Sequence, residues 1–368
     1  MIFKATTADD CVYVSQVTND TSIPASTSHQ GKRQQHAQEE GYAAMGAHVD
    51  DLCAIGDSKG LQKIKDALGK TFNFTENRNP DVVTGIQIER DRAARSLKLH
   101  QTAYTTELLG KYNMLDCRSV DTPVDPGTAR ALMLLPTTPA DPAALKEYQV
   151  LMGMLIWLKC RPDMSYAINL FSRFLSCATS QHLDLLRGRP LRYLKGTVGY
   201  GLVFKAGDSK WKLSGASDSD LAGDLATSRS TSGYFTKLGQ FGVIVASSKL
   251  ERKISTSTGQ AETYAMVSLV KEVVWERHLL RELRHAQVEP TATACDNDGV
   301  LKQSTKVINH SMAKHYRIGQ AYIRYNGEDH TIKVVGIDTA DNPSDIFTKA
   351  LPAPAFIRHR KTLMGPQD

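Results

Sequence analysis

The pattern of apolar and polar positions divides the chain into three parts. In the first part, up to about residue 121, short apolar runs of strand length alternate with polar stretches, and one helical repeat covers residues 58–70. Residues 143–194 show the apolar spacing of two or three amphipathic helices. From Trp211 onward, strand-like runs return and alternate with helices. The pattern therefore predicts three segments of different architecture.

The third part has the clearest pattern. Three strand-like runs with glycine-containing turns follow Trp211 and are close enough to form an antiparallel meander. A long helical repeat then covers Gln260–Arg284, with Thr258 as its expected N-cap. After it we expect a strand, two helices, another strand and a closing helix from Pro343. This order predicts a mixed sheet flanked by helices.

Prolines and polar residues indicate the boundaries. Residues 18–40 are polar and poor in apolar side chains, which predicts a flexible or disordered insert. The proline-rich stretch 122–142 (DTPVDPG and LPTTPADP) is typical of a linker. Pro190 interrupts the last helical repeat of the second part, and we expect it to kink or restart that helix.

Composition supports a globular protein. The 368 residues are 41% hydrophobic, enough for two or three compact domains. No apolar run reaches the length of a membrane span, and the start MIFKATTADD lacks the pattern of a secretory signal. We therefore expect an intracellular protein without membrane contact. The formal net charge of +6 permits nucleic-acid binding without demonstrating it.

Basic side chains concentrate in the second part, with two aromatic residues among them. They could follow the phosphates of a nucleic acid, although an ordinary solvated helix surface explains the same composition equally well. The candidate nucleic-acid-binding residues are Arg161, Arg173, Arg187, Arg189, Arg192 and Lys195.

Asp50 and Asp51 stand side by side between apolar neighbours, in HVDDLCAIG. Adjacent carboxylates repel each other, so a fold keeps them in water at a turn or beside a cation that both can bind. From these residues alone a solvated hairpin tip is the favoured interpretation.

Four other acidic residues stand where predicted elements begin or end: Asp218, Glu262, Asp296 and Asp345. Each has an ordinary explanation as a solvated side chain or as part of a helix start. Together they supply the oxygen ligands that two divalent cations need, and hard oxygen ligands favour Mg²⁺ or Mn²⁺. Such a pair can stabilise the attacking and leaving oxygens of phosphodiester hydrolysis.

Several motifs in order resemble a known family. The stretches SDSDLAGD, RSTSGYF, SSKLERKISTSTGQAETYA, ACDN and NPSDIFTKAL resemble the ribonuclease H domain of copia-type LTR retrotransposon Pol polyproteins. YQVLMGMLIWLKCRPDMSYAINLFSRFLS resembles the segment that precedes this domain, and DDCVY, HVDDLCAIG and LHQTAY resemble the later part of the reverse transcriptase. The resemblance covers nearly the whole chain.

The resemblance implies a fold and a role for each carboxylate. Asp218, Glu262, Asp296 and Asp345 match the four metal-binding carboxylates of the family's ribonuclease H, which uses two ions. Asp50 and Asp51 match the aspartate pair of the polymerase palm. The implied fold is α/β (α+β): a ribonuclease H-like mixed five-stranded sheet with flanking helices, preceded by a truncated palm and a helical thumb or connector. The expected divisions are a palm remnant (1–121, with the insert 18–40), a linker (122–142), the connector (143–205), the ribonuclease H domain (206–350) and a tail (351–368).

The polymerase part departs from the family pattern. Only Met1–Ala8 precede the DDCVY motif, so the strand that carries the third polymerase aspartate and the fingers are expected to be missing. His48 also stands where the family has tyrosine. We interpret Asp50-Asp51 as a polymerase remnant and expect polymerase activity to be lost.

The sequence therefore leaves two functions open. The first is a metal-dependent ribonuclease H that cuts the RNA strand of RNA–DNA hybrids, and the second is a catalytically silent retrotransposon remnant that at most binds nucleic acid. The expected partners are an RNA–DNA hybrid or another nucleic acid and other Pol fragments. The expected location is the cytoplasm, with the nucleus as the alternative.

Overall fold

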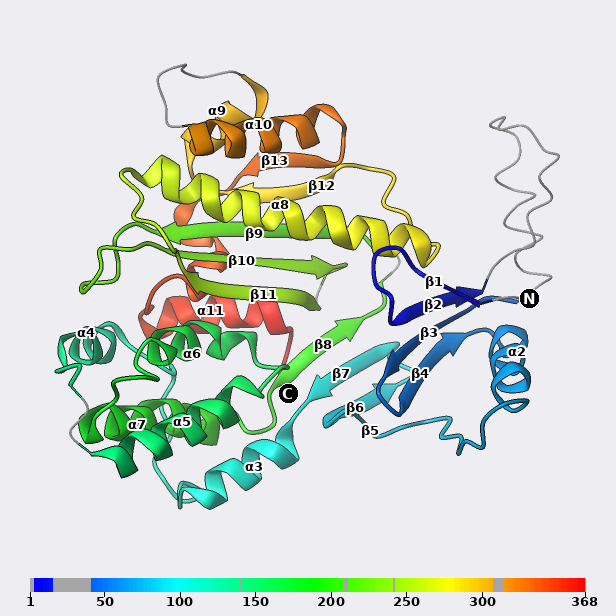
Figure 1. The fold of residues 1–368 in the computed structure, drawn as a ribbon, viewed down its shortest axis with the longest axis horizontal. Helices are drawn as coiled ribbons and strands as arrows, with labels where there is room; N and C mark the ends of the chain where they lie inside the picture. Colours follow the sequence, from blue (N-terminus) through cyan, green and yellow to red (C-terminus); the bar gives the residue numbers. More distant parts are fainter. Residues whose placement is uncertain are drawn as a thin grey trace. The chain divides into compact units, whose positions relative to one another are not determined.

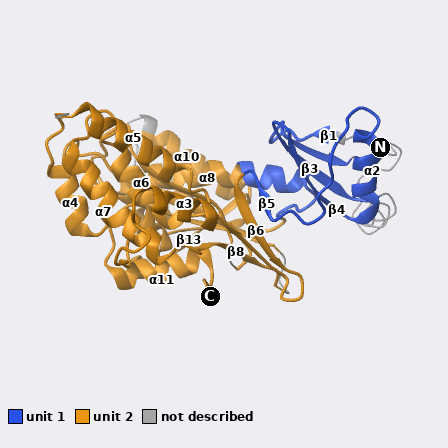
Figure 2. Cartoon of the chain, turned by 90° about the horizontal axis from the view of Figure 1, so that it is seen from below, with its two compact units in different colours: residues 1–84, 275–287 blue, residues 85–274, 288–368 orange. Residues whose placement is uncertain are grey.

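The computed structural model describes residues 3–15, 41–138, 141–207, 211–240, 242–306 and 314–367. The chain forms two compact units (Figure 2). The first consists of residues 1–84 and 275–287, and the second of residues 85–274 and 288–368. The insert expected at 18–40 lies outside the described residues.

The first unit is built on an antiparallel sheet with the strand order β1-β2-β3-β4. Its elements are β1 (Phe3–Ala5), β2 (Val12–Ser15), β3 (Ala43–His48), β4 (Asp51–Gly56), α2 (Ser58–Leu68) and the last residues of α8 (Thr258–Glu282). Asp57 caps α2 by accepting a hydrogen bond from the Gly60 N–H at 2.8 Å. The Glu282 carboxylate accepts hydrogen bonds from the N–H groups of Thr7 and Ala8 at 2.8 and 3.0 Å. These bonds attach the β1–β2 turn to the end of α8.

A five-stranded sheet is the centre of the second unit. Its strand order is β11-β10-β9-β12-β13, with bounds β9 (Leu213–Asp220), β10 (Thr231–Leu238), β11 (Val243–Leu250), β12 (Thr291–Cys295) and β13 (Ile332–Gly336). β9, β10 and β11 form an antiparallel meander, whereas β12 is parallel to both β9 and β13. The predicted mixed five-stranded sheet is confirmed.

Helices of the second unit cover this sheet. α8 lies across it in Figure 1. Its residues Ala261, Ala265 and Leu269 are fully buried. A hydrophobic cluster joins the sheet to the connector helices, with Phe235 of β10 and Leu151 and Phe171 of the connector among its residues. The helices of this unit besides α8 are α3 (Thr102–Lys111), α4 (Pro126–Leu134), α5 (Pro142–Ile156), α6 (Ser165–Ser172), α7 (Ser180–Gly196), α9 (Asp298–Thr305), α10 (Lys314–Glu328) and α11 (Ala353–Met364).

Strand β8 (Gly201–Lys205), at the end of the connector, belongs to a second sheet with strands from the earlier part of the chain. β7 (Ser96–His100) pairs antiparallel with β6 (Ile86–Asp91) on one side and with β8 on the other. β5 (Val82–Val83) precedes them in the chain. The 3₁₀ turns are η2 (Pro162–Met164), η3 (Thr339–Asp341) and η4 (Pro343–Phe347). Within the described ranges, no helix is long and apolar enough to cross a membrane.

One predicted feature of the linker and one of the connector differ in the structure. The stretch 122–142, expected to be a linker, contains α4, whose Leu132 is fully buried. Asp125 caps α4 by accepting from the Thr128 N–H at 2.6 Å, and Pro126 takes the first helical position, where its missing N–H costs nothing. α7 continues through Pro190, which is itself buried, so packing offsets the single backbone hydrogen bond that a proline removes.

Two predicted helix ends also differ. α8 begins at Thr258, and Ser257 caps it: the Ser257 hydroxyl accepts from the Gln260 N–H at 3.3 Å. The closing helix expected from Pro343 is the 3₁₀ turn η4, followed after a break by α11. Five buried residues make up η4, so this short turn is packed into the core beside the sheet.

Candidate metal centre

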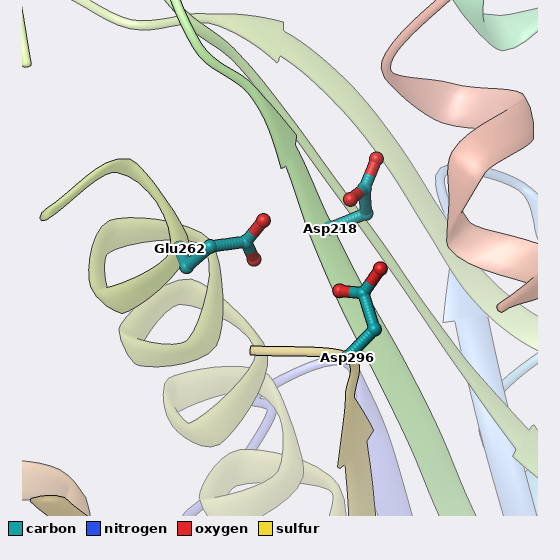
Figure 3. Close-up of side chains that lie close together, drawn as sticks. All are labelled: Asp218, Glu262 and Asp296. Carbon is teal, nitrogen blue, oxygen red and sulfur yellow. The ribbon is translucent and has the colours of Figure 1, made fainter. Parts of the chain in front are cut away.

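Three of the four predicted carboxylates converge at one edge of the five-stranded sheet. Asp218 lies near the end of β9, Glu262 in the first turns of α8, and Asp296 directly after β12. β9 and β12 are parallel, which brings their carboxyl ends to the same edge. One oxygen atom of each side chain lies within 4.8 Å of the others, and the three side chains point toward one another in Figure 3. Among the described residues, no other group of three or more potential ligands meets this criterion.

Glu262 has a strongly raised pKa. Its side chain is buried, and no described group donates a hydrogen bond to its Oε2 atom. Burial, reinforced by Asp218 and Asp296, raises the pKa of Glu262 to about 9. A backbone hydrogen bond from Ser219 and the charge of Lys349 oppose this rise without cancelling it, and the Oε2 atom, which has no donor, favours a proton or a cation. Three converging oxygen ligands of this kind fit a hard divalent cation such as Mg²⁺ or Mn²⁺.

Asp218 is the most enclosed of the three, since only 3% of it is exposed. Burial raises its pKa to about 6, although the positive charge of Lys349 acts in the opposite direction. The Thr348 hydroxyl donates a hydrogen bond to Asp218 Oδ2. Thr348, which follows η4, therefore orients the Asp218 carboxylate. The positive charge of Lys349 compensates the negative charge of Asp218 only in part.

Asp345, the fourth predicted ligand, lies in η4 and is not part of the converging group. Its Oδ1 atom is 2.9 Å from Lys349 Nζ, which also lies 3.8 Å from Asp218 Oδ2. Burial alone would lower the pKa of Lys349, but Asp218 and Asp345 outweigh it and the pKa is raised, so this lysine is charged at neutral pH. The sequence prediction missed Lys349 and Thr348. The four-residue spacing of Asp345 and Lys349 within NPSDIFTKAL was the available signal.

A glycine allows η4 to approach the sheet. Gly233 of β10 lies opposite Asp218 in the strand register. A Cβ atom at Gly233 would lie 2.7 Å from Phe347 Cβ and 2.7 Å from Thr348 Cγ2, closer than side chains tolerate. Asn342 fixes the start of η4, because its amide donates to the Ser217 carbonyl at 3.1 Å and its oxygen accepts from the Ser344 N–H at 3.1 Å. These contacts place Thr348 and Lys349 beside Asp218.

Asp50 and Asp51 lie at the tip of the β3–β4 hairpin and are exposed. Val49 before them has a φ of 51°, the left-handed conformation of a tight turn. They belong to no group of three potential metal ligands in the part of the chain that the structure describes. The residues therefore form the solvated hairpin tip that their local pattern favours.

The basic residues of the connector are engaged within the protein. Arg161 is buried: its guanidinium forms two hydrogen bonds to Asp163, at 3.0 and 2.8 Å, and one to the Thr197 carbonyl at 2.9 Å. The prediction that Arg161 contacts nucleic acid is wrong, because a phosphate cannot reach this guanidinium. Arg173 pairs with Asp224 at 2.8 Å.

The remaining basic candidates on α7 are less enclosed. Arg187 pairs with Glu147, Arg189 pairs with Asp125 at 2.7 Å, and Arg192 donates to the Arg118 carbonyl at 2.7 Å. Lys195 is partly exposed. An ion pair reduces the charge that an arginine offers to a phosphate. A nucleic-acid interface on α7 remains a prediction for these four residues.

Two transposon proteins are similar in sequence to most of the chain. The retrovirus-related Pol polyprotein from transposon TNT 1-94 of Nicotiana tabacum is 33% identical over 315 residues, which cover 84% of this chain and 23% of that protein. The Pol polyprotein from transposon RE2 of Arabidopsis thaliana is 34% identical over 312 residues, covering 84% of this chain and 21% of that protein. The chain thus spans less than a quarter of the length of either relative. No family model matches.

Solved structures are similar to parts of the chain at low sequence identity. Ribonuclease H1 from the archaeon Halobacterium salinarum is 12% identical with a TM-score of 0.28, covering 37% of this chain and 94% of that chain. A foamy viral protease–reverse transcriptase bound to double-stranded DNA is 14% identical with a TM-score of 0.35, covering 59% of this chain and 35% of that chain. At these identities and TM-scores the likeness carries no information on activity.

Proposed function

Because the chain belongs to the copia-type retrotransposon Pol polyproteins, we propose that its ribonuclease H-like domain is a divalent-metal-dependent nuclease that cuts the RNA strand of RNA–DNA hybrids. The converging carboxylates Asp218, Glu262 and Asp296 are the observation that carries this proposal. We propose that the chain acts in the cytoplasm or the nucleus, where it would meet such hybrids.

The side chains of the site have separate tasks in this proposal. Asp218, Glu262 and Asp296 would hold Mg²⁺ or Mn²⁺, which supplies an activated water and stabilises the oxygen that leaves the phosphate. Thr348 keeps the Asp218 carboxylate oriented through its hydrogen bond. The RNA 2′-hydroxyls and the shape of the hybrid would provide the selectivity for RNA.

We also propose that the palm part is inactive as a polymerase in this chain. Nucleotidyl transfer by two metal ions requires carboxylates from more than one strand of the palm. In the described residues, Asp50 and Asp51 occupy a hairpin tip without a third carboxylate nearby. Primer extension by the purified chain, lost on Asp50→Asn, would contradict this proposal.

The direct test is cleavage of an RNA–DNA hybrid labelled on the RNA strand. The full chain should cut it in Mg²⁺ but not in chelator, and Asp218→Asn and Asp296→Asn should each abolish cutting, because they remove ligand charge with little change in volume. Asp50→Asn makes the same chemical change at an exposed hairpin and is the matched control, which should cut like the wild type. Equal cutting by all four proteins would indicate a contaminating nuclease. If the folded wild type does not cut the hybrid, the chain is better explained as a catalytically silent retrotransposon remnant.

A further inference from the structure

A positive charge already lies beside the proposed metal site. Lys349 Nζ is 2.9 Å from Asp345 Oδ1 and 3.8 Å from Asp218 Oδ2. Asp345 is buried, and the Lys349 side chain is 36% exposed. The ammonium therefore lies beside two neighbouring carboxylates that the family resemblance assigns to metal binding, and it can reach water from that position.

We propose that Lys349 takes the place of a second divalent cation, so that the substrate-free chain binds one divalent cation at Asp218, Glu262 and Asp296. This inference rests on the proposed function. It divides the four predicted ligands into a group of three that takes the metal and Asp345, which is neutralised by the lysine.

The geometry of Asp345 supports this division. A cation bound at Asp345 Oδ1 would need the oxygen that Lys349 Nζ already contacts at 2.9 Å. Two positive charges this close repel each other strongly, more so in a partly buried site than in water. Lys349 is four residues from Asp345 in the chain, so its ammonium is always present at high local concentration. A divalent ion has to displace it and recovers only part of that interaction.

The net charge of the four carboxylates and Lys349 also predicts a single bound divalent cation. When ionised, the four carboxylates and the one ammonium carry three net negative charges. One divalent cation reduces this excess to one negative charge, whereas a second would leave the cluster positive. Without the ammonium, two divalent cations would be needed to balance the four carboxylates. Removing the charge of Lys349 should therefore create the second site.

The experiment counts metal ions rather than activity. Mn²⁺ binding to the full chain without nucleic acid is titrated by electron paramagnetic resonance of free Mn²⁺, and the sites counted are those that disappear in Asp218→Asn. We expect one such site in the wild type and two in Lys349→Met, which keeps the length of the side chain without its charge. Lys349→Arg should keep one site. Lys361→Met, at an exposed lysine of α11, is the matched control and should also keep one.

The outcomes separate the inference from the function on which it rests. Two sites in the wild type, or one site in a folded Lys349→Met chain, would overturn the role of Lys349 even if the hybrid is cut. If Lys349→Met does not fold, Lys349→Gln replaces it, and the wild-type count alone still tests the inference. A wild type that binds no Mn²⁺ at Asp218 would overturn both this inference and the proposed function.

Discussion

Replacing Glu262 by glutamine should stabilise the chain in the absence of metal at neutral and alkaline pH. In the folded protein, burial beside Asp218 and Asp296 raises the pKa of this carboxyl to about 9. In the unfolded chain the same carboxyl has its ordinary pKa of about 4.3. Between these values the folded chain holds a proton that the unfolded chain has lost. The stability contributed by this group is therefore complete below the lower pKa and is lost as the pH rises toward the higher one.

The magnitude follows from the distance between the two pKa values. Each pH unit between them lowers the free energy of unfolding by about 1.4 kcal/mol. The wild type has thus lost up to about 4 kcal/mol by pH 7 but only about 1 kcal/mol by pH 5. Glutamine has the shape of the protonated carboxyl and does not ionise. The free energy of unfolding of Glu262→Gln therefore does not fall with pH in this way.

The assay is urea denaturation in chelator at pH 5 and pH 8. The advantage of Glu262→Gln over the wild type should be small at pH 5 and large at pH 8. Glu107→Gln makes the same change at an exposed position of α3 and should show no such pH dependence. Added Mg²⁺ should stabilise the wild type more than Glu262→Gln, because a ligand that binds only the folded state stabilises it. An advantage that is equal at both pH values, or a variant that is less stable than the wild type at pH 8, would show that the folded chain does not hold a proton on Glu262.

Three further substitutions test the structure. Arg161→Gln should destabilise the fold by about 3–5 kcal/mol in urea, because it leaves the charge of the buried Asp163 carboxylate without the guanidinium that pairs with it; unchanged stability together with weakened hybrid binding would instead support a role of Arg161 at the surface. Asp50→Asn should change stability by less than about 0.5 kcal/mol, since the hairpin tip is exposed; a larger loss would reveal an interaction there. Gly233→Ala should lower stability by about 1–3 kcal/mol and weaken Mn²⁺ binding, because the new methyl group displaces Thr348, and unchanged binding would contradict that role.

The C-terminal half was predictable because its local signals agree with one another. The strands β9 to β11 follow one another in the chain with no helix between them, and the long apolar repeat of α8 predicts only a helix. Asp218 and Asp296 were found because they stand in or at the end of predicted strands, and the structure brings them together because β9 and β12 are parallel neighbours. When apolar periodicity and turn residues agree within each segment, the sequence predicts the order and type of the elements.

Contacts between distant residues could not be predicted in this way. Arg161 resembles a surface arginine in sequence, but its partner Thr197 is 36 residues away and only the folded connector brings the two together. Pro190 breaks a helical pattern by its own geometry, and the packing that keeps α7 intact comes from other helices. The contact of Lys349 with Asp218 joins residues 131 positions apart across the sheet edge, so the spacing within NPSDIFTKAL could only indicate its contact with Asp345.

The burial that destabilises the metal-free site also explains why the site could bind metal well. Water competes for a cation less effectively when the ligands are enclosed, and a carboxylate oxygen without a hydrogen-bond donor gives up no such bond when it contacts a metal. Glu262 is buried, and its Oε2 atom has no donor. The free energy that its burial costs in chelator is therefore recovered when a cation binds, which couples metal affinity to folding. Lys349 limits that cost most at Asp218 and Asp345, the two carboxylates that its ammonium approaches, and less at Glu262. We therefore expect the one divalent cation to bind where Glu262 and Asp296 meet Asp218.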